Sequence, residues 1–109
     1  MELQAILDTI KSESLTLIKD EFKELINNAK NDKSEFIQKS AEQLKQALSD
    51  LAEGKLSKDD VTTLLKKQQK IAEIEANNAE IELRARIQKI IYRILDISLN
   101  TMIKEIKPA

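Results

Sequence analysis

The sequence contains no cysteine, no histidine and no tryptophan. Without cysteine or histidine, the chain has no disulfide, no thiolate nucleophile, no imidazole for acid–base catalysis and none of the usual ligands of structural zinc. Two phenylalanines and one tyrosine are the only aromatic residues, so a core has to be aliphatic. The single glycine, Gly54, and the single proline, Pro108, leave two long stretches without a strong helix breaker.

Long apolar runs and an excess of one charge are also missing. No stretch approaches the roughly 20 apolar residues that span a bilayer. Residues 1–11 lack the basic segment and apolar run of a signal peptide. The 18 basic and 19 acidic residues give a formal net charge of −1, and their interspersed order argues against a nucleic-acid partner. We therefore expect a cytoplasmic protein with no membrane span, no cofactor, no metal site and no catalytic residues.

What the sequence does contain is the composition and apolar spacing of long amphipathic helices. The clearest helix boundary lies in the middle of the chain. Gly54 suits the left-handed position that ends a helix. Ser57 is a natural N-cap, and Asp60 three residues later completes a capping box. Leu56 and Val61 then occupy the two positions of a hydrophobic staple, so four signals agree on a turn.

These signals predict one all-α domain, residues 1–109, with a helix at about 2–53, a turn at 54–57 and a helix at about 58–106. The second helix would be roughly 70 Å long. The polar stretch Asn27–Lys33 interrupts the first helix as a bend or a full turn. We favour a long antiparallel, coiled-coil-like hairpin turning at Gly54, with a bend in that stretch. A three-helix bundle is the alternative.

The width of the apolar stripes bears on assembly. Over residues 61–79 the apolar side chains lie mostly within roughly 140° of the helix circumference, with Ile74 and Ile81 outside this sector. From Ile87 onward they cover roughly 240°. Two helices of one hairpin cannot cover that surface, and a monomer would expose a large apolar patch. We therefore expect a homodimer in which the two ends of each chain join a helical bundle. The residues expected at this oligomer or partner interface are Leu3, Ile10, Leu17, Phe22, Ile87, Ile90, Ile91, Ile94, Leu95, Leu99 and Met102.

Basic side chains on the second helix suggest a different partner. Arg84, Arg86, Lys89 and Arg93 would form a basic helix face of the kind that contacts RNA phosphates. Acidic residues at favourable i,i+4 spacing, such as Glu80 before Arg84, indicate ordinary surface ion pairs instead.

Together these features predict a non-catalytic helical oligomerisation and protein-interaction module, such as an adaptor, small chaperone or assembly scaffold. It would act by packing helices against a second copy or against an amphipathic helix of another protein. The alternative is a small dimeric helical-bundle protein that binds structured RNA through its basic face.

Overall fold

The computed structural model describes residues 1–108, and in this range every regular element is a helix. The predicted all-α class is therefore confirmed. In chain order the elements are α1 (Leu3–Asp8), the short 3-10 turn η1 (Glu13–Leu15), α2 (Thr16–Lys30), α3 (Glu35–Ala52), α4 (Lys58–Asn78), α5 (Ile81–Arg86), the π-helical segment η2 (Ile87–Tyr92), α6 (Arg93–Ile97), the π-helical segment η3 (Ser98–Met102) and α7 (Ile103–Glu105).

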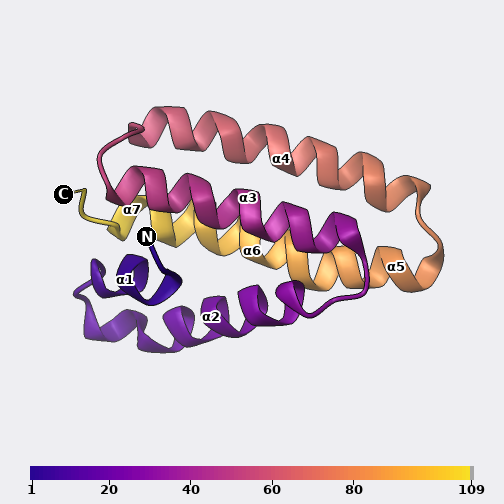
Figure 1. Cartoon of the computed structure of the whole chain (residues 1–109), viewed down its shortest axis with the longest axis horizontal. Helices are drawn as coiled ribbons and strands as arrows, with labels where there is room; N and C mark the ends of the chain where they lie inside the picture. The colour runs from indigo at the N-terminus through magenta and orange to yellow at the C-terminus, as the bar shows by residue number, and fades with distance from the viewer. Residues whose placement is uncertain (109) are drawn as a thin grey trace.

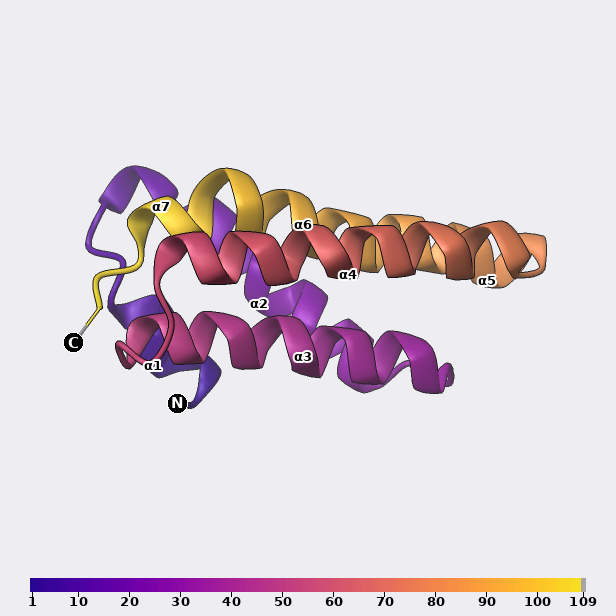
Figure 2. The same ribbon diagram turned by 90° about the horizontal axis from the view of Figure 1, so that it is seen from above.

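The long helices of the chain pack side by side with alternating direction (Figure 1). They are α2, α3, α4 and the continuous run from α5 to α7, which we call the C-terminal helix (residues 81–105). The short α1 packs against α3 at the end of the bundle where both termini lie (Figure 2). The molecule measures 41 × 26 × 20 Å, well short of the roughly 70 Å expected for an unbroken helix over 58–106. One chain thus forms a four-helix bundle of its own.

The predicted turn at Gly54 is confirmed in detail. Gly54 has φ +76° and ends α3. Ser57 caps α4: its Oγ accepts the N–H of Asp60 at 3.0 Å, and the Asp60 carboxylate accepts the N–H of Ser57 at 3.3 Å. Leu56 and Val61 both pack into the core, as a hydrophobic staple requires.

At Asn27–Lys33 the chain makes a full turn, whereas the favoured hairpin had only a bend there. α2 ends at Lys30, and α3 begins after Ser34, whose Oγ accepts the N–H of Ile37. The Asp32 side chain accepts the N–H of Ser34 at 2.8 Å and stabilises the turn. As a result α2 lies antiparallel to α3.

The predicted second helix is also interrupted, at Ala79 and Glu80. Both residues have extended backbone, with ψ of 156° and 159°. Arg84 reaches back across the break: its Nε donates to the carbonyl of Ala76 at 2.9 Å and its Nη2 to that of Ala79 at 3.2 Å. The guanidinium therefore bonds carbonyl groups at the end of α4, where the regular helical hydrogen bonds stop. The chain then returns beside α4 as the C-terminal helix (Figures 1 and 2).

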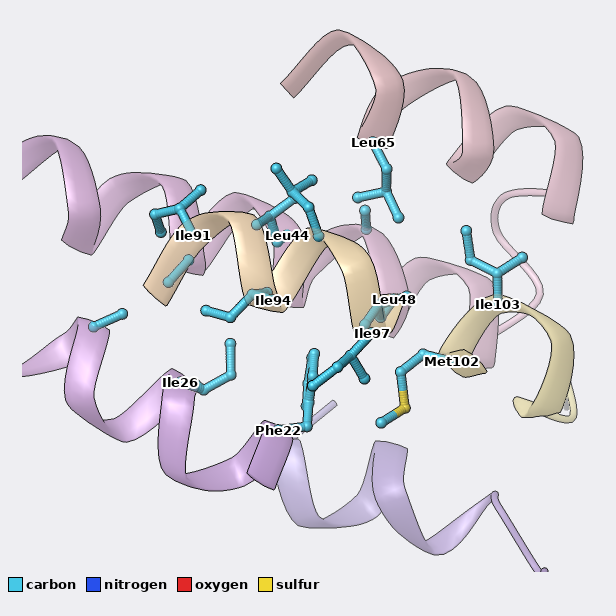
Figure 3. Close-up of a cluster of buried hydrophobic side chains, with 14 of the residues drawn as sticks. Phe22, Ile26, Leu44, Leu48, Leu65, Ile91, Ile94, Ile97, Met102 and Ile103 are labelled. Carbon is cyan, nitrogen blue, oxygen red and sulfur yellow. The ribbon is translucent and has the colours of Figure 1, made fainter. Parts of the chain in front are cut away.

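This arrangement explains the wide apolar stripe of the C-terminal helix. Its segments contact α2, α3 and α4, so apolar side chains are needed on most of its circumference. Figure 3 shows Phe22 and Ile26 of α2 meeting side chains of the C-terminal helix such as Ile94. The largest fully buried side chains of the chain are Phe22, Ile6, Ile37, Leu44, Leu48, Leu51, Leu65, Ile87, Ile91, Ile94, Leu95 and Met102.

Candidate protein-interaction surface

The residues predicted at an oligomer interface lie mostly in the core of the single chain. Leu3 and Leu99 are partly buried against the core, and Leu17 is 82% exposed. The remaining residues of that set are buried: Ile10, Phe22, Ile87, Ile90, Ile91, Ile94, Leu95 and Met102. The inference from stripe width required a second chain to cover the C-terminal helix. Because α2, α3 and α4 cover it instead, that requirement no longer holds.

Arg86, one of the four basic residues considered for RNA, is held in an internal ion pair. Its Nε lies 3.1 Å and its Nη2 3.4 Å from the two carboxylate oxygens of Asp32, whose side chain is 8% exposed. Burial raises the pKa of Asp32, but the hydrogen bond from the Ser34 N–H and the contacts with Arg86 together outweigh it and lower the pKa. The pair therefore joins the α2–α3 turn to the start of the C-terminal helix.

Arg93 and Arg84 also make hydrogen bonds within the chain. Arg93 donates from Nε and Nη2 to the carboxylate of Glu21 on α2, at 2.7 and 2.9 Å, and from Nη1 to Asp96. The hydrogen bond to Glu21 is the main reason why the pKa of Arg93 is raised. Arg84 bonds backbone carbonyls at the α4–α5 break, and of the four basic residues Lys89 alone belongs to the exposed class. A phosphate backbone would have to displace the contacts of Arg84, Arg86 and Arg93 to reach these side chains.

Exposed apolar side chains gather instead on α4. Leu64 is 42%, Ile71 38% and Ile74 62% exposed, and their spacing of seven and three residues places them on one side of the helix. α4 buries only a narrow stripe toward the core, formed by Val61, Leu65, Ala72 and Ala76. Two of these four are alanines, so α4 commits little of its apolar surface to the bundle.

The side of α4 that carries Leu64 and Ile71 borders two adjoining hollows between α3 and α4. One has a volume of about 380 Å³ and is lined by Phe36, Lys39, Ser40, Gln43, Leu64, Lys67, Gln68 and Ile71. The other, of about 250 Å³, is lined by Gln43, Gln46, Ala47, Asp50, Leu64, Leu65 and Gln68. Because Gln43, Leu64 and Gln68 line both, the hollows form one open channel, which we call the α3–α4 groove.

The two ends of the α3–α4 groove differ in charge. The larger hollow is lined by two cations, Lys39 and Lys67, and by no carboxylate. The smaller hollow is lined by one carboxylate, Asp50, and by no cation. Lys39 pairs with exposed Glu35 at 2.8 Å. The glutamines between the two ends offer both donors and acceptors. An apolar floor with polar walls of this kind can hold the apolar face of a helix.

Sequence reasoning did not find this groove, and the one outlying apolar residue on α4, Ile74, lines neither hollow. Ile74 falls outside the narrow stripe of residues 61–79, and the structure leaves it the most exposed of the three apolar side chains on α4. Leu64 and Ile71 fall within the stripe. The edge of that stripe faces the groove, so both side chains remain partly open to solvent.

None of the helices in residues 1–108 combines the length and the apolar character that crossing a bilayer requires. In the same part of the chain, no three carboxylates gather as a metal-binding cluster. Comparisons of the chain with protein-family models, with curated proteins and with solved structures find no match.

Proposed function

We propose that this protein is a non-catalytic helical interaction module that binds a partner helix in the α3–α4 groove. The observation that carries the proposal is the partly exposed apolar surface of Leu64 and Ile71, which lies beside a groove with further apolar lining from Phe36. Helix-in-groove recognition uses apolar side chains at i, i+3, i+4 and i+7, which dock on such a surface. Adaptor, small-chaperone and scaffold roles all share this mechanism.

The location of the proposed surface differs from the one expected from the sequence. An interface built from Ile94 and its buried neighbours would require the bundle to open, since these side chains are inaccessible in the folded chain. The α3–α4 groove needs no such opening. Self-association and a cytoplasmic location stay predictions from the sequence.

The test is site-specific photo-crosslinking in the cell from adjacent positions of α3. A photoreactive side chain replaces Gln43, which lines the groove, or Glu42, which is exposed on the side of α3 that faces α2. We expect adducts from position 43 that map to the apolar face of a helix, and that disappear when Ile71→Asp is added. Far-UV circular dichroism of each variant checks that the bundle is intact.

Two results would contradict the proposal. The first is the same set of adducts from positions 42 and 43, because these differ in the surface they face. The second is a set of adducts from position 43 that Ile71→Asp leaves unchanged. An adduct between two copies of the chain would identify self-association as the function of the groove.

A further inference from the structure

The distribution of charge in the α3–α4 groove bears on which helix it accepts, an inference that rests on the proposed function. The larger hollow combines the apolar side chains of Phe36, Leu64 and Ile71 with both lysines of the groove. Affinity from apolar burial and attraction for negative charge therefore coincide at one end of the groove. Lys67 makes no ion pair within residues 1–108, so its charge is available to a partner.

We infer that the occupant of the α3–α4 groove is an amphipathic helix of another protein whose apolar face is flanked by carboxylates. Its apolar side chains would pack on Phe36, Leu64 and Ile71. A carboxylate of the partner would lie beside Lys67, whereas Lys39 already pairs with exposed Glu35. Glutamines 43 and 68 would donate and accept hydrogen bonds along the walls.

A second copy of the chain fits this surface less well. In a two-fold dimer the same patch meets itself. Lys39, Lys67 and Ile71 line one hollow, so a dimer that buries the two Ile71 side chains together also brings lysines toward lysines. Like charges facing each other across an interface weaken it and select against that partner. The same lysines favour an acidic helix.

The dipoles of the two helices that form the walls of the groove give it no net preference for a positive or a negative partner. α3 and α4 run antiparallel on the two sides of the groove, so the partial charges at their termini oppose each other. The side chains therefore determine the sign of charge that the groove prefers. Asp50 lines the smaller hollow, so at that end of the groove a positive partner charge is favoured instead. Asp50 lies eleven residues from Lys39 along α3, or roughly 16 Å.

The experiment compares two synthetic helical peptides with the same leucine seam at i, i+3, i+4 and i+7. One peptide carries glutamate at the flanking positions and the other carries lysine. Fluorescence anisotropy titrations measure their affinity for the native chain and for two variants, Lys67→Glu and Lys66→Glu. Lys66 is an exposed neighbour on α4 that does not line the groove, so both variants change the net charge equally.

We expect the glutamate peptide to bind the native chain about fivefold more tightly than the lysine peptide at low salt, and this ratio to shrink as salt is added. Lys67→Glu should abolish or reverse the preference, whereas Lys66→Glu should change it by less than about twofold. Equal binding of the two peptides, or equal effects of the two variants, would overturn the inference.

Ile71→Asp separates this inference from the proposed function. If both peptides bind equally and Ile71→Asp weakens both, the groove binds helices without selecting acidic ones, and only the inference fails. If neither peptide binds, or Ile71→Asp has no effect on binding, the proposed function fails as well. A native dimer in light scattering that Ile71→Asp converts to a monomer would assign the groove to a second copy and overturn the acidic partner.

Discussion

The ion pair between Arg86 and Asp32 contributes to stability because Asp32 is nearly buried: its side chain is 8% exposed. Arg86→Ala would leave that carboxylate without its cation, and we expect the free energy of unfolding to fall by about 2 kcal/mol. Urea denaturation followed by circular dichroism measures the change. Lys39→Ala is the control, since Lys39 and Glu35 form an exposed pair, 2.8 Å apart, that touches neither Asp32 nor Arg86, and it should cost much less. Equal costs would show that Asp32 does not depend on Arg86.

Glu53 provides a pH-dependent contact between the N-terminus and the end of α3. The hydrogen bond from the Met1 amino group, followed by the contacts with Lys55, lowers the pKa of Glu53 from 4.5 to about 2. A lowered pKa in the folded state stabilises the protein above the unfolded value of 4.5. That stability is lost as the pH falls from about 4.5 to about 2.

A carboxyl-resolved NMR titration tests this prediction for Glu53. In Glu53→Gln the stability should be lower than in the native chain near neutral pH, and the difference should narrow as the pH falls through the same window. A Glu53 carboxyl that titrates near its ordinary value would contradict the contact.

At the scale of elements, the turn between α3 and α4 depends on the left-handed conformation of Gly54. Gly54→Ala places a Cβ in that conformation, and we expect it to destabilise the protein by about 1–2 kcal/mol. Gly54→Asn should cost less, because asparagine tolerates left-handed backbone. Thermal unfolding of the two variants measures the difference. Equal losses would indicate that the loss of glycine, rather than the left-handed backbone, causes the effect.

The two interruptions of the helices differ in how local their causes are. The turn at Gly54 is specified within the segment from Gly54 to Val61, so the sequence alone predicts it. The break at Ala79 and Glu80 has no glycine, no proline and no side-chain cap at Glu80. Arg84 bonds the carbonyls of Ala76 and Ala79, and packing of the C-terminal helix along α4 compensates for the interruption. Only the folded chain contains that compensation, so the pattern of residues 58–106 predicts a continuous helix.

At the scale of the whole molecule, stripe width correctly indicates how many neighbours a helix has, but not which chain supplies them. The roughly 240° stripe of the C-terminal helix requires several neighbours, and α2, α3 and α4 of the same chain provide them. The all-α class and most core residues therefore follow from periodicity. The α3–α4 groove does not, because it depends on the relative position of two helices that each look ordinary in sequence.

A core formed by one chain and a core shared between two chains differ in how their unfolding depends on protein concentration. Ile94 is fully buried, whereas Ile74 is 62% exposed. We expect Ile94→Ala to lower the free energy of unfolding by about 2–5 kcal/mol, and Ile74→Ala by less than about 0.5 kcal/mol.

Because Ile94 packs within its own chain, the loss of stability in Ile94→Ala should be the same at every protein concentration. If two chains joined at Ile94, the unfolding midpoint would rise with concentration, and the substitution would weaken that dependence. Denaturation curves over a hundredfold range of concentration, for the native chain and both variants, separate these cases.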